Sequence, residues 1–133
     1  MVDRKSSKSR WEVYERSNKV IKKGLSICIF PEKDYLDNTK LLNEFKRGAF
    51  KLSIDHQIPI VPMAFLDCKR KFPWHTNYGK PGKLRVETFS TIYPKKKHDK
   101  IENLQKTTRQ IILNALKNDP LQKNKEAIDL EHN

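Results

Sequence analysis

Apolar positions recur at helical spacing near the start of the chain and predict a first helix. Ser9-Arg10-Trp11-Glu12 matches a capping box, in which the serine oxygen and the glutamate side chain satisfy free backbone amides. The apolar positions that follow fall on one helical face, and Gly24 suits the left-handed conformation that ends a helix. We therefore expect a helix that begins near Ser9 and stops at Gly24.

Two apolar, β-branched runs predict strands on either side of a second helix. The runs are Leu25–Phe30, which closes in Pro31, and Ile60–Phe65, and an amphipathic stretch from about Lys46 to His56 separates them. Strand, helix and strand at this spacing indicate a βαβ unit and therefore an α/β fold. In such sheets ligands bind just beyond the carboxyl ends of the strands.

The rest of the chain predicts one more strand and a last helix. Lys83–Phe89 alternates well enough for a strand, with Leu84 and Val86 on one face. Asp99 can cap a helix whose apolar stripe begins at Ile101. From residue 118 the pattern dissolves, so we expect 118–133 to form a flexible tail.

The charge balance indicates the kind of partner that the protein binds. The 133 residues carry 28 Lys and Arg against 16 Asp and Glu, a formal charge of +12, which favours an anionic partner such as a phosphate-bearing substrate, anionic lipid or nucleic acid.

Cys28 and Cys68 form no metal or disulfide pattern, so a reducing, cytoplasmic compartment is expected. The apolar runs are shorter than a membrane-spanning helix requires. Trp74 and Tyr78 lie in a basic loop that suits a membrane interface or base stacking, or folds over the sheet edge.

Two charged residues are candidates for chemistry. Glu32 comes directly after Pro31, at the open end of the predicted sheet, where a carboxylate can orient a substrate; the alternative is that it faces solvent or caps a turn. Arg4 precedes the first helix among other basic residues, and its guanidinium suits a phosphate; the alternative is a solvated basic terminus.

The histidines show no catalytic or metal-binding arrangement. No pair has the spacing of a zinc site, and none is followed five positions later by Asp: His56, His75, His98 and His132. His56 ends a predicted helix, where a cation suits the helix dipole, so a structural role is favoured. We expect neither a metal nor another cofactor.

Together these segments resemble the later part of the PlsC-like (lysophosphatidic acid acyltransferase) family of glycerolipid acyltransferases. The family has four sequence blocks, the first being the catalytic pair His-x-x-x-x-Asp. Val2-Asp3-Arg4 is similar to the second block, Ile29-Phe30-Pro31-Glu32 to the third and Ile60-Val61-Pro62 to the fourth. Phe45–Phe50 is similar to the linker between blocks three and four, and the resemblance extends over roughly Val2 to Phe65.

The resemblance implies a fold, an activity and a binding site. The fold would be a partial βαβ sheet of the glycerolipid acyltransferase fold with flanking helices, and residues 1–117 would be the carboxyl-terminal part of that domain. The activity would be the transfer of a fatty acyl group from acyl-CoA or acyl-carrier protein to a lysophospholipid or glycerol phosphate, in phospholipid synthesis at the inner face of the membrane. Arg4 would bind phosphate, and Glu32 would organise the acceptor.

The remaining substrate-binding residues follow from the same blocks. They are Phe30, Pro31, Lys33 and Pro62, of which Pro62 would shape the end of the second strand. Lys33 departs from the family, which has glycine there, and could compensate by supplying a charge. The arginine that often follows in block three is also missing.

The largest departure is the catalytic pair, because His-x-x-x-x-Asp occurs nowhere in these residues. A general base contributes about 10² to 10⁴-fold to the rate, so we expect a truncated chain that is inactive alone and needs an amino-terminal segment with block one. A partial domain would leave sheet edges and apolar faces uncovered, which predicts self-association or marginal stability. The alternative function is a non-catalytic basic module that binds anionic lipid or nucleic acid, although no specific nucleic-acid motif is present.

Overall fold

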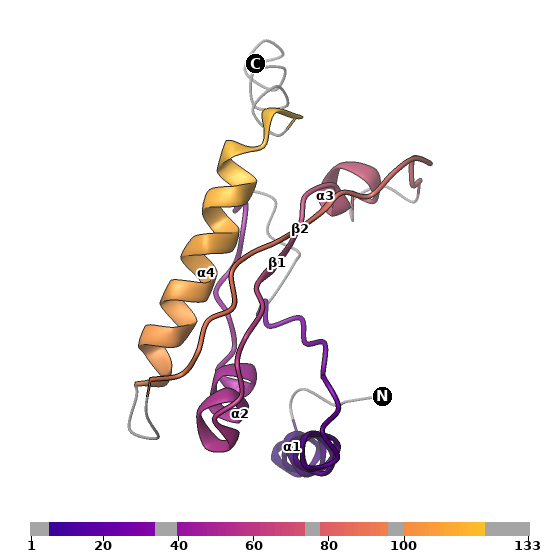
Figure 1. The fold of residues 1–133 in the computed structure, drawn as a ribbon. Coiled ribbons are helices and arrows are strands. Elements are labelled where there is room, and N and C mark those ends of the chain that lie inside the picture. The colour runs from indigo at the N-terminus through magenta and orange to yellow at the C-terminus, as the bar shows by residue number, and fades with distance from the viewer. Residues whose placement is uncertain (1–5, 34–39, 74–77, 96–99, 122–133) are drawn as a thin grey trace.

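The computed structural model of this chain describes residues 6–33, 40–73, 78–95 and 100–121 (Figure 1). Its elements, in order, are α1 (Ser7–Lys22), α2 (Gly48–His56), β1 (Met63–Phe65), α3 (Cys68–Lys71), β2 (Val86–Thr88) and α4 (Ile101–Asn118). The mixed helix and strand content agrees with the predicted α/β class.

The sheet, however, is built differently from the predicted βαβ unit. β1 pairs with β2 in an antiparallel register, with Met63 opposite Thr88 and Phe65 opposite Val86. An isolated antiparallel bridge between Ile60 and Ile92 continues the pairing toward the amino-terminal side of β1. The third predicted strand is therefore present, as β2. It lies beside β1, where the βαβ prediction placed residues 25–30.

The prediction of a buried strand at Leu25–Phe30 is wrong. These residues form neither helix nor strand, and all of them are exposed. A strand is stable only when a neighbouring strand satisfies its backbone groups, and the described residues place no strand beside this run. The run leaves α1 through Gly24, whose φ of 74° confirms the predicted left-handed stop.

The helices follow the apolar periodicity more closely than the strands do. α2 and α4 are confirmed, and α2 ends at His56 as predicted. α1 begins earlier than predicted, because the Oγ of Ser6 accepts the Ser9 backbone N–H, at 3.3 Å; the capping box at Ser9 is wrong. Asp99, the predicted cap of α4, lies outside the described residues, and so does most of the predicted tail.

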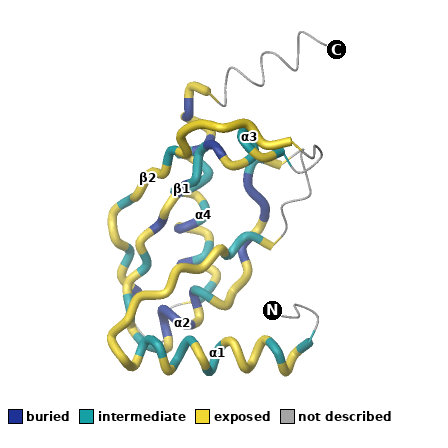
Figure 2. Tube along the Cα trace, turned by 90° about the vertical axis from the view of Figure 1, so that its right-hand side faces the viewer, coloured by how far each residue is buried: buried dark blue, intermediate teal, exposed yellow. Residues whose placement is uncertain are grey.

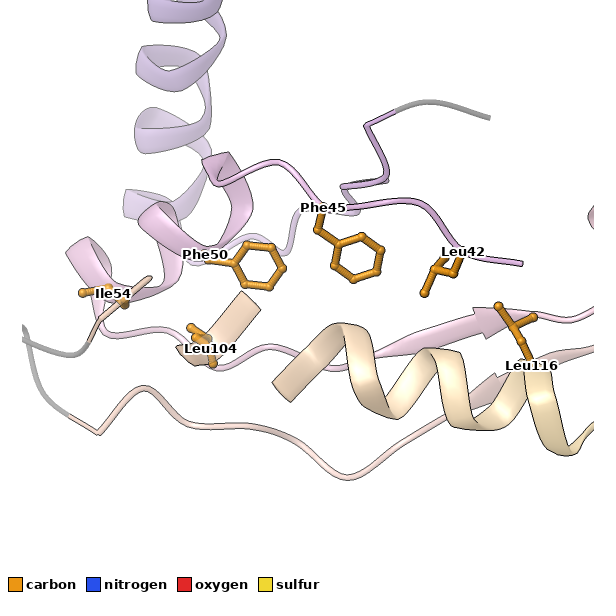
Figure 3. Packing of buried hydrophobic residues seen from close by; sticks show 6 residues of the cluster. All are labelled: Leu42, Phe45, Phe50, Ile54, Leu104 and Leu116. Atoms are coloured by element: carbon orange, nitrogen blue, oxygen red, sulfur yellow. The ribbon is translucent and has the colours of Figure 1, made fainter. Parts of the chain in front are cut away.

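The core lies where α2, α4 and the segment before α2 meet. Six buried residues form it: Leu42, Phe45, Phe50, Ile54, Leu104 and Leu116 (Figure 3). The rings of Phe45 and Phe50 stack, with centroids 6.2 Å apart. α4 packs against β1 on this side of the sheet, while the run from Gly24 to Lys33 passes on the other side (Figure 1). No helix within the described ranges is both long enough and apolar enough to cross a membrane.

Candidate functional site

The predicted block-three residues lie in a short extended segment that pairs with the chain just before α2. Glu32 and Phe45 form an antiparallel bridge. The backbone N–H of Lys33 donates to the Glu44 carbonyl, and that of Lys46 donates to the Pro31 carbonyl, both at 2.7 Å. This pairing holds Glu32 at a defined position next to the core residue Phe45.

Asn43 fixes the side chain of Glu32. The backbone N–H of Asn43 donates to Glu32 Oε1 at 2.9 Å, and its side-chain amide donates to the same oxygen at 3.3 Å. Asn43 is buried and Glu32 is half-buried. Because both described donors reach Oε1, they leave Oε2 available to accept a hydrogen bond from a ligand hydroxyl.

The loop that carries Asn43 is held by side chains from two other elements. From α4, Arg109 Nε donates to the Asn43 carbonyl at 3.0 Å, and the Gln105 amide donates to the Phe45 carbonyl. From α3, Lys69 Nζ donates to the Lys40 carbonyl at 2.7 Å. A carboxylate supported in this way is pre-organised to orient a bound group.

The other predicted site residues that the structure describes lie either in the segment that contains Glu32 or next to β1. Phe30 is 73% exposed, and its ring lies 5.7 Å from that of Phe65 at the carboxyl end of β1. The structure therefore brings the segment that ends in Glu32 beside the end of β1. Pro62 is fully buried one residue before β1, and its carbonyl accepts the Phe89 N–H. Lys33 is exposed, and Arg4 lies outside the described residues.

His56 has a structural position, as its place in the sequence suggested. Its Nε2 lies 2.7 Å from Asn18 Oδ1 and so joins α2 to α1. Nearby, the Tyr14 hydroxyl donates to Asp55, and Lys51 Nζ donates to the same carboxylate at 2.6 Å. These hydrogen bonds lower the pKa of Asp55. His75 lies outside the described residues.

A second group of charged residues joins the end of β1 to the end of α4. Arg85 donates to Asp67 and Asp119, both of which are buried, and Arg70 also donates to Asp67. The hydrogen bonds from Arg85 lower the pKa of Asp67 and Asp119, although burial alone would raise them. These charged groups pair with one another and so join the two elements. We call Asp67, Arg70, Arg85 and Asp119 the clamp.

A cavity of about 570 Å³ opens beside this clamp, between β2 and the carboxyl-terminal half of α4. Its lining combines apolar side chains such as Phe89 and Ile111 with Arg85, Glu87 and Asn118. In the described ranges, no group of three or more His, Cys, Asp or Glu side chains is placed to hold a metal ion. The residues that line this cavity include no Ser, Cys or His side chain.

The fixed position of the Glu32 carboxylate suits the site to orienting a bound group. Glu32 can accept a hydrogen bond from a hydroxyl, and Lys33 can supply positive charge beside it. The sequence did not predict three residues that support this site: Asn43, Arg109 and Gln105. Gln105 and Arg109 stand four residues apart in α4, so the sequence indicates that they share one side of the helix. Nothing in the sequence indicates that this side contacts the loop at Asn43.

Comparison with known proteins bears directly on this segment. An acyltransferase family model matches residues 1–66, which include Glu32 and Pro62. A "probable 1-acyl-sn-glycerol-3-phosphate acyltransferase" of Mycoplasma pneumoniae is 31% identical over 65 residues, covering 49% of this chain and 24% of that protein. The human "1-acyl-sn-glycerol-3-phosphate acyltransferase beta" is 34% identical over 74 residues, covering 51% and 26%.

A plant protein extends the similarity toward the third predicted strand. The 1-acyl-sn-glycerol-3-phosphate acyltransferase of Cocos nucifera is 30% identical over 92 residues, covering 68% of this chain and 30% of that protein. The chain thus spans between about a quarter and a third of the length of these relatives. No solved structure matches the chain.

Proposed function

Because residues 1–66 of this chain belong to the PlsC-like acyltransferase family, we propose that the protein takes part in moving a fatty acyl group onto a lysophospholipid or glycerol phosphate acceptor. The donor is an acyl thioester of CoA or acyl-carrier protein, and the product enters phospholipid synthesis. The observation that carries the proposal is the fixed carboxylate of Glu32, held by Asn43 on a loop that α4 supports.

In this proposal Glu32 orients the acceptor. The acceptor hydroxyl donates a hydrogen bond to Oε2 of Glu32, and the cationic groups of Lys33 and Arg4 bind its phosphate. The hydroxyl oxygen then attacks the thioester carbonyl carbon, the carbon–sulfur bond breaks, and the thiol leaves. The hydroxyl proton must pass to a general base, and Glu32 only positions the oxygen that loses it.

We also propose that the base comes from polypeptide outside these 133 residues, on a segment that carries the family's His-x-x-x-x-Asp. No histidine of this chain has an aspartate five positions later, and His56 is engaged with Asn18 between two helices. Without such a segment the rate should fall by about 10² to 10⁴-fold. We further propose that the protein works at the cytoplasmic face of an anionic membrane, because lysophospholipid acceptors reside in membranes and a formal charge of +12 favours anionic lipid.

A binding experiment on the chain alone tests the role of Glu32 without requiring turnover. Monomeric lysophosphatidic acid is titrated into isotope-labelled protein, and the amide signals of Lys33 and Asn43 are followed by NMR. We expect saturable shifts, and the Glu32→Gln variant should bind about tenfold more weakly because a charge-assisted hydrogen bond is lost. Glu44→Gln is the matched control, since Glu44 is an exposed glutamate in the same paired segment.

Equal weakening in the two variants, or no shift at Lys33 and Asn43, would overturn the proposed acceptor site. Acyl transfer is then measured from acyl-CoA, with and without a co-expressed polypeptide segment that carries the His-x-x-x-x-Asp block of the family. We expect activity only with that segment, and it should be lost in Glu32→Gln. Binding without any complemented activity would favour the non-catalytic lipid-binding module.

A further inference from the structure

A basic arm projects beyond the carboxyl end of β1. It consists of residues 68–73, which contain α3, and residues 78–83, which lead back toward β2 (Figure 1). Residues 78–83 are exposed throughout (Figure 2). The two stretches contain five basic residues and no Asp or Glu: Lys69, Arg70, Lys71, Lys80 and Lys83. Arg70 pairs with the buried Asp67, whereas the four lysines meet no carboxylate within the arm itself. The arm therefore favours an anionic ligand.

The two stretches of the arm are held together by specific contacts. The backbone N–H of Lys80 donates to the Lys71 carbonyl at 2.8 Å, and Lys71 Nζ donates to the Pro81 carbonyl at 3.0 Å. Gly79 lies so close to the ring of Phe72 that a Cβ at this position would collide with the ring. These contacts fix the position of the Phe72 ring relative to the lysines.

Phe72 places an exposed aromatic ring among these cations. Part of its ring contacts Gly79, yet Phe72 is 62% exposed. The ring follows Lys71 in the chain, and its contact with Gly79 brings it next to Lys80. An exposed aromatic ring can stack on the planar base of a nucleotide, and lysine ammonium groups bind phosphates. The ring and the lysines together match the two parts of a single nucleotide.

The arm is joined to the loop that positions Glu32. Lys69 Nζ donates to the Lys40 carbonyl at 2.7 Å. Three residues further along this loop, the backbone N–H of Asn43 donates to Glu32 Oε1. A ligand bound on the arm is thus held next to the loop that supports the candidate acceptor site.

We infer that the basic arm binds the nucleotide end of a CoA thioester, with Phe72 stacked on the adenine and with Lys80 and Lys83 on the phosphates. The inference rests on the proposed function in one respect, because the acyl donor must come close to the acceptor at Glu32. It goes further by selecting CoA over acyl-carrier protein as the donor for this chain. CoA carries adenine and several phosphates, so one molecule supplies both the base and the anions.

The size and chemistry of the arm argue against other anionic occupants. An acidic carrier protein would match the lysines, but it has no planar base for the exposed ring of Phe72. A polynucleotide needs a positively charged groove that follows its backbone over several nucleotides, whereas the arm consists of two short stretches. A single nucleotide needs one ring and a few cations, and the arm provides both.

Binding of free CoA to the full 133-residue chain tests the inference without acceptor, acyl group or turnover. CoA is titrated under reducing conditions into isotope-labelled protein, and the amide signals of Lys71, Gly79 and Lys80 are followed by NMR. We expect saturable shifts at these amides. Phe72→Leu should bind CoA about fivefold more weakly, because the stacking surface is lost. Tyr93→Leu is the matched control, since Tyr93 is an aromatic residue that is 69% exposed outside the arm, and it should leave the affinity unchanged.

Two double variants with the same change of charge test the phosphate contacts. Lys80→Gln with Lys83→Gln should weaken CoA binding by about tenfold, because two charge-assisted contacts are lost. Lys8→Gln with Lys19→Gln removes the same charge from exposed positions on α1 and should change the affinity by less than about twofold. Pyrophosphate, which lacks the base, should bind the wild type more weakly than CoA does, and Phe72→Leu should bind it as the wild type does.

Equal effects of Phe72→Leu and Tyr93→Leu, equal effects of the two double variants, or pyrophosphate binding as tight as that of CoA would each overturn the inference. Arm signals that shift with an acidic acyl-carrier protein and stay unchanged with CoA would overturn it as well. These measurements are read on the arm and need no acceptor, whereas lysophosphatidic acid is read at Lys33 and Asn43. Failure on the arm therefore leaves the acceptor site at Glu32 untouched, and failure at Glu32 leaves nucleotide binding on the arm untouched.

Discussion

Arg85 and Asp67 form two parallel hydrogen bonds across the end of the sheet. Arg85 Nε donates to Asp67 Oδ2 at 2.9 Å, and Nη2 donates to Oδ1 at 2.7 Å. Asp67 is only 1% exposed, so its charge depends on this partner and on Arg70. The other side of the Arg85 guanidinium binds Asp119, which ties the end of α4 to the chain that follows β1.

Replacing Asp67 with Asn should destabilise the protein by about 2 kcal/mol, because the buried side chain loses the charge that strengthens its hydrogen bonds from Arg85 and Arg70. The free energy of unfolding in urea measures the loss. Glu87→Gln is the control, because Glu87 is an exposed carboxylate on the neighbouring strand, and its substitution should change stability by less than about 0.5 kcal/mol. Similar losses in both variants would show that the clamp adds nothing specific.

The same clamp should make stability depend on acid. The pKa values of Asp67 and Asp119 are lowered in the folded protein, chiefly by hydrogen bonds from Arg85. Their contribution is therefore complete above the ordinary carboxyl pKa of about 4 and is lost as the pH falls toward their folded values. The wild type should lose stability more steeply below about pH 5 than Asp67→Asn does. Parallel pH profiles of the unfolding free energy would contradict this.

The fold was predictable from the sequence where structure is decided locally. The apolar stripes of α2 and α4 need only their own spacing to specify a helix and its buried face, and Gly24 needs only its own conformational freedom. A strand requires a second strand, which local sequence does not provide. Leu25–Phe30 has the composition of a buried strand, yet the described residues leave it unpaired, so its composition alone misled the prediction.

The candidate site shows the same division. Glu32 stood out in the sequence because it follows an apolar run that closes in Phe30 and Pro31, and its role in binding stays a prediction. Its partner Asn43 lies 11 residues away, and Arg109, which holds the Asn43 carbonyl, lies a further 66 residues along the chain. Contacts over such separations depend on how α4 packs against the loop, which no spacing in one sequence specifies.

Arg109→Ala should loosen the loop that positions Glu32. The variant leaves the Asn43 carbonyl without its side-chain donor, so we expect amide hydrogen exchange at Lys33 and Lys46 to become about tenfold faster. Gln110→Ala removes the next side chain of α4, which is exposed and donates to Asn114 on the same helix, and serves as the control. Unchanged exchange at Lys33 in Arg109→Ala would mean that the loop is held without Arg109.

α1 should unfold separately from the rest of the protein. It has no buried residue, and polar contacts attach it to α2: Tyr14 with Asp55, and Asn18 with His56. Tyr14→Phe removes one of these hydrogen bonds and should speed amide exchange along α1 by roughly fivefold, while α4 exchanges as before. Glu12→Gln, at an exposed position on the same helix, should leave exchange in α1 unchanged. If Tyr14→Phe instead speeds exchange equally in α1 and α4, the two helices unfold together and the contacts at Asp55 and His56 support the whole fold.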